Sequence, residues 1–121
     1  MAKNVYKKGD NDNRPWGRWE VIDAGEGFCV KRITVNPKHI LSLQMHNYRS
    51  EHWIIVNGTA KVTNGEDIFE LESGKSTFIP MKQKHRIENP YNEVMVFIEI
   101  QTGNNLDEND IIRFEDSYGR V

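Results

Sequence analysis

The chain has 121 residues, enough for one domain and its hydrophobic core but little more. Sixteen Lys and Arg residues stand against eighteen Asp and Glu, so the formal charge is −2. This balance argues against a protein that captures nucleic acid or an anionic membrane by charge, and neither is expected as a partner. No apolar run approaches the roughly 20 residues that cross a bilayer, and the polar start of the chain lacks the apolar segment of a secretory signal. The single cysteine, Cys29, cannot form an internal disulfide, so we expect a cytoplasmic protein.

The alternation of short apolar segments and turn residues along the chain predicts an all-β protein. Residues 1–13 are polar and without periodicity, so we expect a mobile or loosely docked arm before a single domain over residues 14–121. Short segments rich in Val, Ile, Phe and Thr then alternate with turn residues, as in a sandwich or barrel. The expected strands are residues 19–22, 28–35, 41–46, 52–56, 60–63, 67–71, 76–79, 85–88 and 94–101. Asn64–Gly65 predicts a tight hairpin with a type I′ turn. Residues 111–114 fit one more strand or a short helical turn, and no segment favours a longer helix.

The segment 41–46 alternates between an apolar face and a polar face that holds Gln44 and His46. In an ordinary half-buried strand the polar face would be exposed to water. However, Glu51 follows His46 by five residues, and His85 opens another expected strand. Gln44, His46, Glu51 and His85 offer a mixed nitrogen and oxygen ligand set that suits Zn²⁺, Mn²⁺, Fe²⁺ or Co²⁺. The alternative is a structural polar cluster without a metal.

Two spaced motifs resemble those of the cupin superfamily. The first cupin motif (Gly, five residues, His, one, His, four, Glu, six, Gly) falls here on Lys38, Gln44, His46, Glu51 and Gly58. The second (Gly, five residues, Pro, one, Gly, two, His, three, Asn) falls on Gly74, Pro80, Lys82, His85 and Asn89. Lys38 and Lys82 replace glycines, so a turn with positive φ at either position would be strained.

Within the cupins, the sequence is similar to type II mannose-6-phosphate isomerases. The resemblance covers residues 14–120, through RPWG, VKRITV, LSLQMH, EHW, GTAKV, IRFED and YGR. In that family the isomerase is commonly the C-terminal domain of a bifunctional enzyme that also carries a guanylyltransferase, an activity we do not expect from this chain. The resemblance implies a single-domain cupin jelly-roll barrel, or double-stranded β-helix, with one divalent metal inside. Zinc is the first candidate, with Mn, Co, Fe and Ni as alternatives.

The family's reaction, the interconversion of mannose 6-phosphate and fructose 6-phosphate through a cis-enediol(ate), suggests roles for further residues. Metal ligands Gln44, His46, Glu51 and His85 would leave the ion positively charged to polarise the substrate carbonyl. Lys31 and Glu99 are the acid/base candidates, although each could instead be an exposed surface group. The expected substrate contacts are Arg14, Arg113 and Arg120 for the phosphate, Trp16 for the sugar face, and Gln101 beside Glu99. Taken singly, each arginine could equally form a surface ion pair.

Three functions stay open. The leading hypothesis is a metal-dependent sugar-phosphate isomerase that feeds polysaccharide synthesis. The alternatives are a non-catalytic cupin that binds a sugar or sugar phosphate as a sensor or accessory subunit, and another cupin enzyme such as an iron-dependent dioxygenase. Leu41, Leu43 and Met45 form an apolar outer face that a second subunit or the N-terminal arm would cover, so a homodimer is expected. Cys29 is expected to be a buried, inert thiol.

Overall fold

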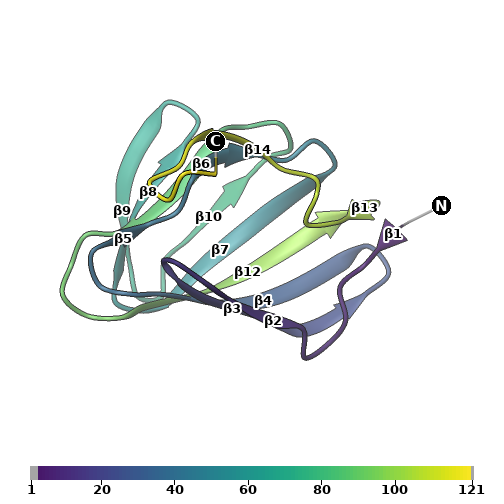
Figure 1. Ribbon diagram of the computed structural model, residues 1–121, viewed down its shortest axis with the longest axis horizontal. Helices are drawn as coiled ribbons and strands as arrows, with labels where there is room; N and C mark the ends of the chain where they lie inside the picture. Colours follow the sequence, from purple (N-terminus) through teal and green to yellow (C-terminus); the bar gives the residue numbers. More distant parts are fainter. Residues whose placement is uncertain (1–2, 121) are drawn as a thin grey trace.

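Two six-stranded β-sheets face each other in the protein, with a two-stranded ribbon at one end (Figure 1). The computed structural model describes residues 3–120. Its strands are β1 (Lys3–Asn4), β2 (Asn11–Arg14), β3 (Gly17–Gly25), β4 (Phe28–Val35), β5 (His39–Ile40), β6 (Leu43–Met45), β7 (Arg49–Asn57), β8 (Thr59–Asn64), β9 (Asp67–Glu72), β10 (Ser76–Ile79), β11 (His85–Asn89), β12 (Met95–Gly103), β13 (Asn105–Leu106) and β14 (Ile112–Glu115). The stretch from Lys3 to Arg120 contains no helix, and so none that could span a membrane.

The strand order places segments distant in sequence side by side. The first sheet runs β10-β7-β12-β4-β3-β2 and the second runs β14-β6-β11-β8-β9, with β5 also paired to β11. All pairs within these sheets are antiparallel, whereas the β1–β13 ribbon is parallel. This arrangement confirms the predicted all-β jelly-roll class. The C-terminal stretch that fitted either a strand or a helical turn forms the edge strand β14.

The inner faces of the two sheets form a core that is apolar except around one group of polar side chains. Along β4, Cys29, Ile33 and Val35 are buried in alternation with more exposed residues. Along β12, Met95 and Phe97 point inward in the same way. Lys31 and Glu99 continue these two inward rows, and the same alternation buries them at 6% exposure each. Strand periodicity thus turns two charged groups into the interior.

Turns explain two departures from the sequence-based picture. The β8–β9 hairpin is confirmed, but the register pairs Asn64 with Asp67, so the two loop residues are Gly65 and Glu66. A type I′ turn centred on Asn64–Gly65 needs positive φ at both residues. Gly65 has a φ of 64°, but Asn64 is not among the described non-glycine residues with positive φ, so the predicted turn type is wrong. Lys38 and Lys82 do adopt positive φ, at 62° and 64°. The cupin turns therefore keep the left-handed conformation although lysine replaces glycine.

The N-terminal segment packs against the barrel from Lys3 onward, in contrast to the expected mobile or loosely docked arm; residues 1 and 2 lie outside the described part. The β1 strand pairs with β13, and Asn4 Nδ2 donates hydrogen bonds to the carbonyl oxygens of Gly25 (2.7 Å) and Phe28 (2.9 Å). Tyr6 is only 6% exposed. The sequence gives no local sign of this docking because the pairing joins residues about a hundred positions apart.

The three apolar residues that suggested a homodimer, Leu41, Leu43 and Met45, do not form one outer face in the structure. Leu41 lines the internal cavity and packs against the core, whereas Leu43 and Met45 are half-buried and pair with Glu115 and Ile112 of β14. The C-terminal strand thus lies beside this segment within the same chain. The homodimer stays a prediction.

Candidate active site

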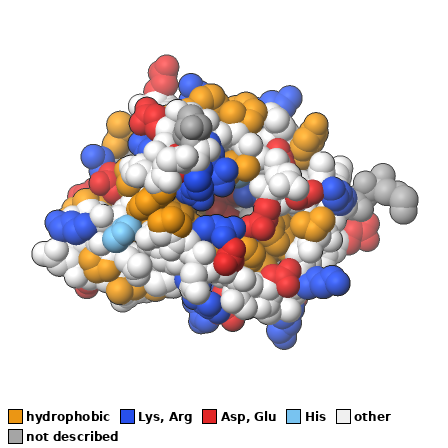
Figure 2. All heavy atoms as spheres, viewed as in Figure 1, with side chains coloured by type: hydrophobic (Ala, Val, Ile, Leu, Met, Phe, Trp, Pro, Cys, Tyr) orange, Lys and Arg blue, Asp and Glu red, His pale blue; other side chains and the backbone are white. Residues whose placement is uncertain are grey.

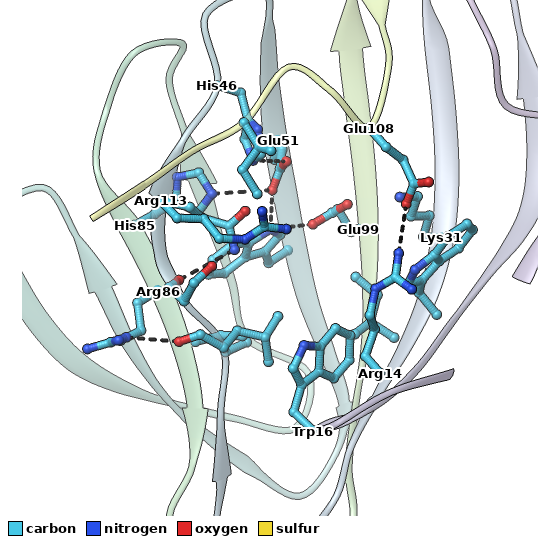
Figure 3. A pocket seen from close by; sticks show the side chains of 18 of the residues that line it. Arg14, Trp16, Lys31, His46, Glu51, His85, Arg86, Glu99, Glu108 and Arg113 are labelled. Carbon is cyan, nitrogen blue, oxygen red and sulfur yellow. Dashed lines mark hydrogen bonds and ion pairs between the residues drawn. The ribbon is translucent and has the colours of Figure 1, made fainter. Parts of the chain in front are cut away.

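Three buried side chains gather their ligand atoms at one end of the space between the sheets. His46 follows β6, Glu51 lies in β7 and His85 begins β11, and one ligand atom from each lies within 4.8 Å of the others. None of the three is more than 3% exposed. Gln44 pairs directly with His85 across β6 and β11 and lines the same cavity. Figure 3 shows His46, Glu51 and His85 together on one side of the cavity.

Hydrogen bonds from the far side of each ring orient the two histidines. The Nδ1 atom of His46 donates to the carbonyl oxygen of Asp110 (2.6 Å), and that of His85 donates to the carbonyl oxygen of Gln83 (2.9 Å). A carbonyl oxygen can only accept, so Nδ1 carries the proton in both rings and Nε2 is left with its lone pair. Such outer hydrogen bonds fix the tautomer that a metal ligand needs.

The charge state of the cluster also suits a cation. Burial lowers the pKa of His46 to about 4, and burial likewise lowers that of His85, so both rings are neutral at pH 7. Burial alone would raise the pKa of Glu51, but the Arg49 guanidinium beside it holds that pKa well below its usual range. Two neutral imidazoles and one carboxylate therefore form a donor set that fits a divalent first-row metal.

Arg49 sits against these ligand atoms and was not singled out from the sequence. Its Nε donates to Glu51 Oε2 (2.9 Å) and its second terminal nitrogen donates to His46 Nε2 (3.2 Å). Burial alone would lower the pKa of Arg49, but Glu51 and Glu99 raise it above its usual value, so the guanidinium is charged. Its place between His46 and Glu51 in sequence was the available signal, since a buried carboxylate needs a compensating charge.

Glu99 lies next to the ligand cluster and shares a hydrogen-bond donor with it. The indole Nε1 of Trp53 donates to Glu51 Oε1 (2.9 Å) and to Glu99 Oε1 (3.2 Å). Burial, with the nearby Glu51 carboxylate, raises the pKa of Glu99 to about 8. Gln101 does not line the cavity: it is fully buried behind Glu99, and its Nε2 donates to Glu99 Oε2 (2.8 Å). The structure thus places Gln101 as a support for Glu99, away from the space a substrate would enter.

Lys31 is held between two aromatic rings. Its Nζ lies 4.2 Å from the ring centroid of Tyr6 and 4.3 Å from that of Trp19. Burial lowers the pKa of Lys31, although the Glu99 charge acts in the opposite direction. Cation–π contacts with both rings stabilise the ammonium form in a place with little water. Lys31 also lines the cavity, as the sequence predicted.

Arginines surround the mouth of the cavity. Figure 2 shows Lys and Arg side chains gathered around a hollow near the middle of one face. The arginines that line the cavity are Arg14, Arg49, Arg86, Arg113 and Arg120. Arg14 pairs with Asp12 and Glu108, Arg86 with Glu115, and Arg120 with Asp116. The buried Nε of Arg113 has no hydrogen-bond partner among residues 3–120.

Trp16 reaches the cavity from the turn between β2 and β3. The turn has two residues, because Arg14 pairs with Gly17, and Trp16 is 5% exposed. A Cβ at Gly17 would collide with the carbonyl oxygen of Thr34, so only glycine lets β3 approach β4 this closely beside the turn. Figure 3 shows Arg14, Trp16 and Lys31 on the side opposite His85.

Comparisons with known proteins show the family and the fold of the chain. The family model described as mannose-6-phosphate isomerase, C-terminal, matches residues 2–116. The chain belongs to this family. The xanthan biosynthesis protein XanB of Xanthomonas campestris pv. campestris is 54% identical over 108 residues, covering 89% of this chain and 23% of XanB. The mannose-1-phosphate guanylyltransferase ManC of Salmonella typhimurium is 49% identical over 121 residues, covering 100% of this chain and 24% of ManC.

This member of the mannose-6-phosphate isomerase C-terminal family thus spans about a quarter of the length of these relatives. Its fold matches that of a Klebsiella pneumoniae protein with a double-stranded β-helix domain, with a TM-score of 0.69, 17% identity and coverage of 80% of this chain and 78% of that one. At that identity the likeness shows the fold alone, which is the double-stranded β-helix of the cupins.

The family member's cavity brings together nearly all the residues predicted for the site. Gln44, His46, Glu51 and His85 line it with Lys31, Glu99, Arg14, Trp16, Arg113 and Arg120, whereas Gln101 does not. Sequence reasoning missed Tyr6, Trp19, Arg49, Trp53 and Glu108, which also line it. An isolated aromatic such as Tyr6 in a polar stretch carries no periodic signal. Trp53 could have been found, because it lies two residues from Glu51 and so shares its strand face.

Proposed function

We propose that this protein is a metal-dependent isomerase that interconverts mannose 6-phosphate and fructose 6-phosphate. The observation that carries the proposal is the single indole N–H of Trp53 that joins ligand Glu51 to the acid/base candidate Glu99 within one buried cavity. Family membership supports the substrate class. An aldose–ketose isomerisation needs proton-transfer groups beside a cation, and the closeness of Glu99 and Lys31 to the His46, Glu51 and His85 cluster supports the proposal.

The chain's own residues divide the reaction between them. His46, Glu51, His85 and Gln44 would hold a divalent cation, which supplies Lewis-acid polarisation of the substrate carbonyl. A proton must leave C2 of mannose 6-phosphate and return to C1, while a second proton moves between the two oxygens. Glu99 and Lys31 face the cavity from adjacent strands and are the groups that carry these protons. Gln101 and Trp53 hold the Glu99 carboxyl in place through hydrogen bonds.

The cavity mouth supplies the phosphate contacts. Arg113 has no ion pair among the described residues, and its guanidinium offers the paired N–H donors that a phosphate accepts. Arg14 and Arg120 flank the same cavity and add positive charge. Charge from three arginines would fix one end of the substrate while the carbon chain reaches towards Glu99.

The test is a coupled assay of the purified chain with mannose 6-phosphate, before and after removal of metal by a chelator. We expect turnover that chelation abolishes and that a divalent cation restores, and we expect His85→Ala to abolish it as well. His52→Ala is the matched control, because His52 is exposed on the outer face, 4.6 Å from Phe78 between ring centroids. Sugar-phosphate binding without turnover would instead favour a sensor or accessory subunit, and iron-dependent oxygen uptake would favour an oxygenase.

A further inference from the structure

We propose that the hydroxyl group of Tyr6 binds the substrate, donating a hydrogen bond to a hydroxyl or carbonyl oxygen of the sugar chain. The N-terminal segment would then complete the active site. This inference rests on the proposed function for the identity of the ligand as a sugar phosphate. It concerns a residue outside the barrel strands that carry the metal ligands and the acid/base pair.

The first observation is an unpartnered polar atom inside the cavity wall. Tyr6 lines the cavity and is 6% exposed, and its buried Oη atom has no hydrogen-bond partner anywhere from Lys3 to Arg120. Buried hydroxyl groups are nearly always hydrogen-bonded, and leaving one unpaired is destabilising. A ligand oxygen that enters the cavity would remove this cost, so the hydroxyl favours an occupied cavity.

The second observation is that the ring is firmly positioned. Its centroid lies 6.3 Å from that of Trp19 with the planes at 87°, and the Lys31 ammonium lies 4.2 Å from its centre. The Tyr6 backbone N–H donates to Asn4 Oδ1 (3.0 Å), while Asn4 Nδ2 anchors the segment to the β3–β4 turn. The backbone N–H of Val5 donates to the carbonyl oxygen of Leu106 (3.0 Å). The hydroxyl is therefore held ready for a ligand, which reduces the ordering cost of binding.

The third observation is the division of chemistry across the cavity. The phenol stays neutral, because burial raises its pKa above the usual value, with Arg49 acting in the opposite direction. The cavity's cationic groups, Arg113 among them, are better partners for phosphate, since charged donors bind a phosphate oxygen more strongly than a neutral hydroxyl does. A neutral donor and acceptor such as Tyr6 Oη instead matches the neutral oxygens of a polyol chain. The ligand class for this position is thus the carbon chain of an open-chain sugar phosphate.

The test compares Tyr6→Phe with the wild type and with Tyr91→Phe. Phenylalanine keeps the ring against Lys31 and Trp19 and removes only the hydroxyl. Tyr91 is the matched control, because its exposed hydroxyl donates to Glu70 and does not line the cavity. Two quantities are measured on metal-loaded protein: the dissociation constant of sorbitol 6-phosphate, an open-chain polyol phosphate that cannot isomerise, and kcat/KM for mannose 6-phosphate. Thermal melting provides a third readout.

We expect Tyr6→Phe to weaken sorbitol 6-phosphate binding and to lower kcat/KM, each roughly tenfold for the loss of one hydrogen bond. Its melting temperature should equal or exceed that of the wild type, since the change removes an unpaired buried hydroxyl. Tyr91→Phe should leave binding and turnover unchanged. A merely structural role would lower the melting temperature together with the affinity, and that result would overturn the proposal.

The outcomes separate this inference from the proposed reaction. Wild-type protein that isomerises mannose 6-phosphate, with Tyr6→Phe equal to it in binding and rate, overturns the Tyr6 contact alone. Wild-type protein that binds sorbitol 6-phosphate without turnover overturns the isomerase, and the tenfold affinity loss in Tyr6→Phe then still supports the contact. Wild-type protein that neither binds nor turns over these compounds overturns both.

Discussion

Lys31 and Glu99 lie directly opposite each other on the neighbouring strands β4 and β12, and both side chains are buried. Burial acts against the charged form of each: it lowers the pKa of Lys31 and, together with the Glu51 carboxylate, raises that of Glu99 to about 8. Well-packed apolar side chains at these two positions would avoid the desolvation cost. Stability of the fold therefore does not account for the two charged groups. Their position beside His46, Glu51 and His85 is the one that the proposed acid/base role requires.

Glu99→Gln should lower kcat by about 10²- to 10⁴-fold, the usual contribution of a positioned acid or base. Glutamine preserves the size of the side chain and an oxygen that can accept from Trp53 Nε1. Its new NH2 group can donate to the unpartnered Gln101 Oε1 once the Gln101 amide flips, so the packing should survive. The bound metal, measured by atomic emission, should stay at the wild-type stoichiometry. Glu20→Gln serves as the control, since Glu20 pairs with Arg32 outside the cavity. A Glu99→Gln variant within threefold of wild-type activity would remove Glu99 from the mechanism.

Asp110→Ala should weaken metal binding by about 10- to 100-fold, although Asp110 is not one of the predicted ligands. The backbone carbonyl of Asp110 orients His46, and its carboxylate accepts hydrogen bonds from the backbone N–H groups of Asn47 (2.9 Å) and Tyr48 (3.0 Å). Without the carboxylate, the loop that carries this carbonyl loses two of its attachments. Competition with a chromophoric chelator measures the affinity, and Asp67→Ala, in the exposed hairpin, is the control. Equal affinities would show that the loop holds His46 by other contacts.

Arg113→Met should raise KM for mannose 6-phosphate by about 10- to 100-fold, because a charge-assisted hydrogen bond contributes about 1.5–3 kcal/mol. Burial and the Arg120 charge lower the pKa of Arg113. A bound anion would offset both effects and stabilise the charged guanidinium. Inhibition by inorganic phosphate should weaken in parallel. Arg18→Met, at an exposed position on β3, should change neither quantity. Unchanged phosphate inhibition in Arg113→Met would place the phosphate elsewhere.

The sequence predicted which of these residues meet at the cavity because their signals are local, whereas their roles as metal ligands and acid/base pair stay predictions. Gln44 and His46 share a face by strand alternation, and the motif spacing joins them to Glu51 and His85. Lys31 and Glu99 follow from the same alternation. Periodicity says which face a residue occupies but not how far along the strand the cavity extends, so Gln101 was predicted to touch substrate although it lies behind Glu99.

The N-terminal contribution could not be predicted in this way. Tyr6 reaches the cavity because β1 pairs with β13, whose residues lie about a hundred positions later in the chain. No local pattern encodes such a contact, and the polar residues around Tyr6 suggested a loose arm. Arg49 illustrates a second limit: its charge matters because Glu51 is buried, and burial depends on the whole fold.

Lys82→Gly should raise the free energy of unfolding by about 1 kcal/mol, because lysine at a φ of 64° pays for a conformation that glycine adopts freely. The backbone N–H of Lys82 donates to the carbonyl oxygen of His46 (2.8 Å), a bond that glycine retains. Urea unfolding with an unchanged m-value provides the measurement. Lys75→Gly, at an exposed lysine that lacks positive φ, should be neutral or destabilising. A destabilised Lys82→Gly would show that the lysine side chain offsets the backbone strain.

Cys29 should make the folded protein less stable as the pH rises from about 9 towards 11. Burial raises the pKa of this thiol to about 11, whereas the unfolded thiol ionises near 9, so the unfolded state loses its proton first. The linked loss between pH 8 and pH 10 is about 1 kcal/mol. Urea midpoints at the two pH values measure it, and Cys29→Ala, which has no thiol to ionise, should lack this component.

The same burial predicts that the native thiol reacts with iodoacetamide far more slowly than the thiol of urea-unfolded protein. Rapid alkylation of the native protein, or equal pH dependence in Cys29→Ala, would contradict a buried, un-ionised Cys29.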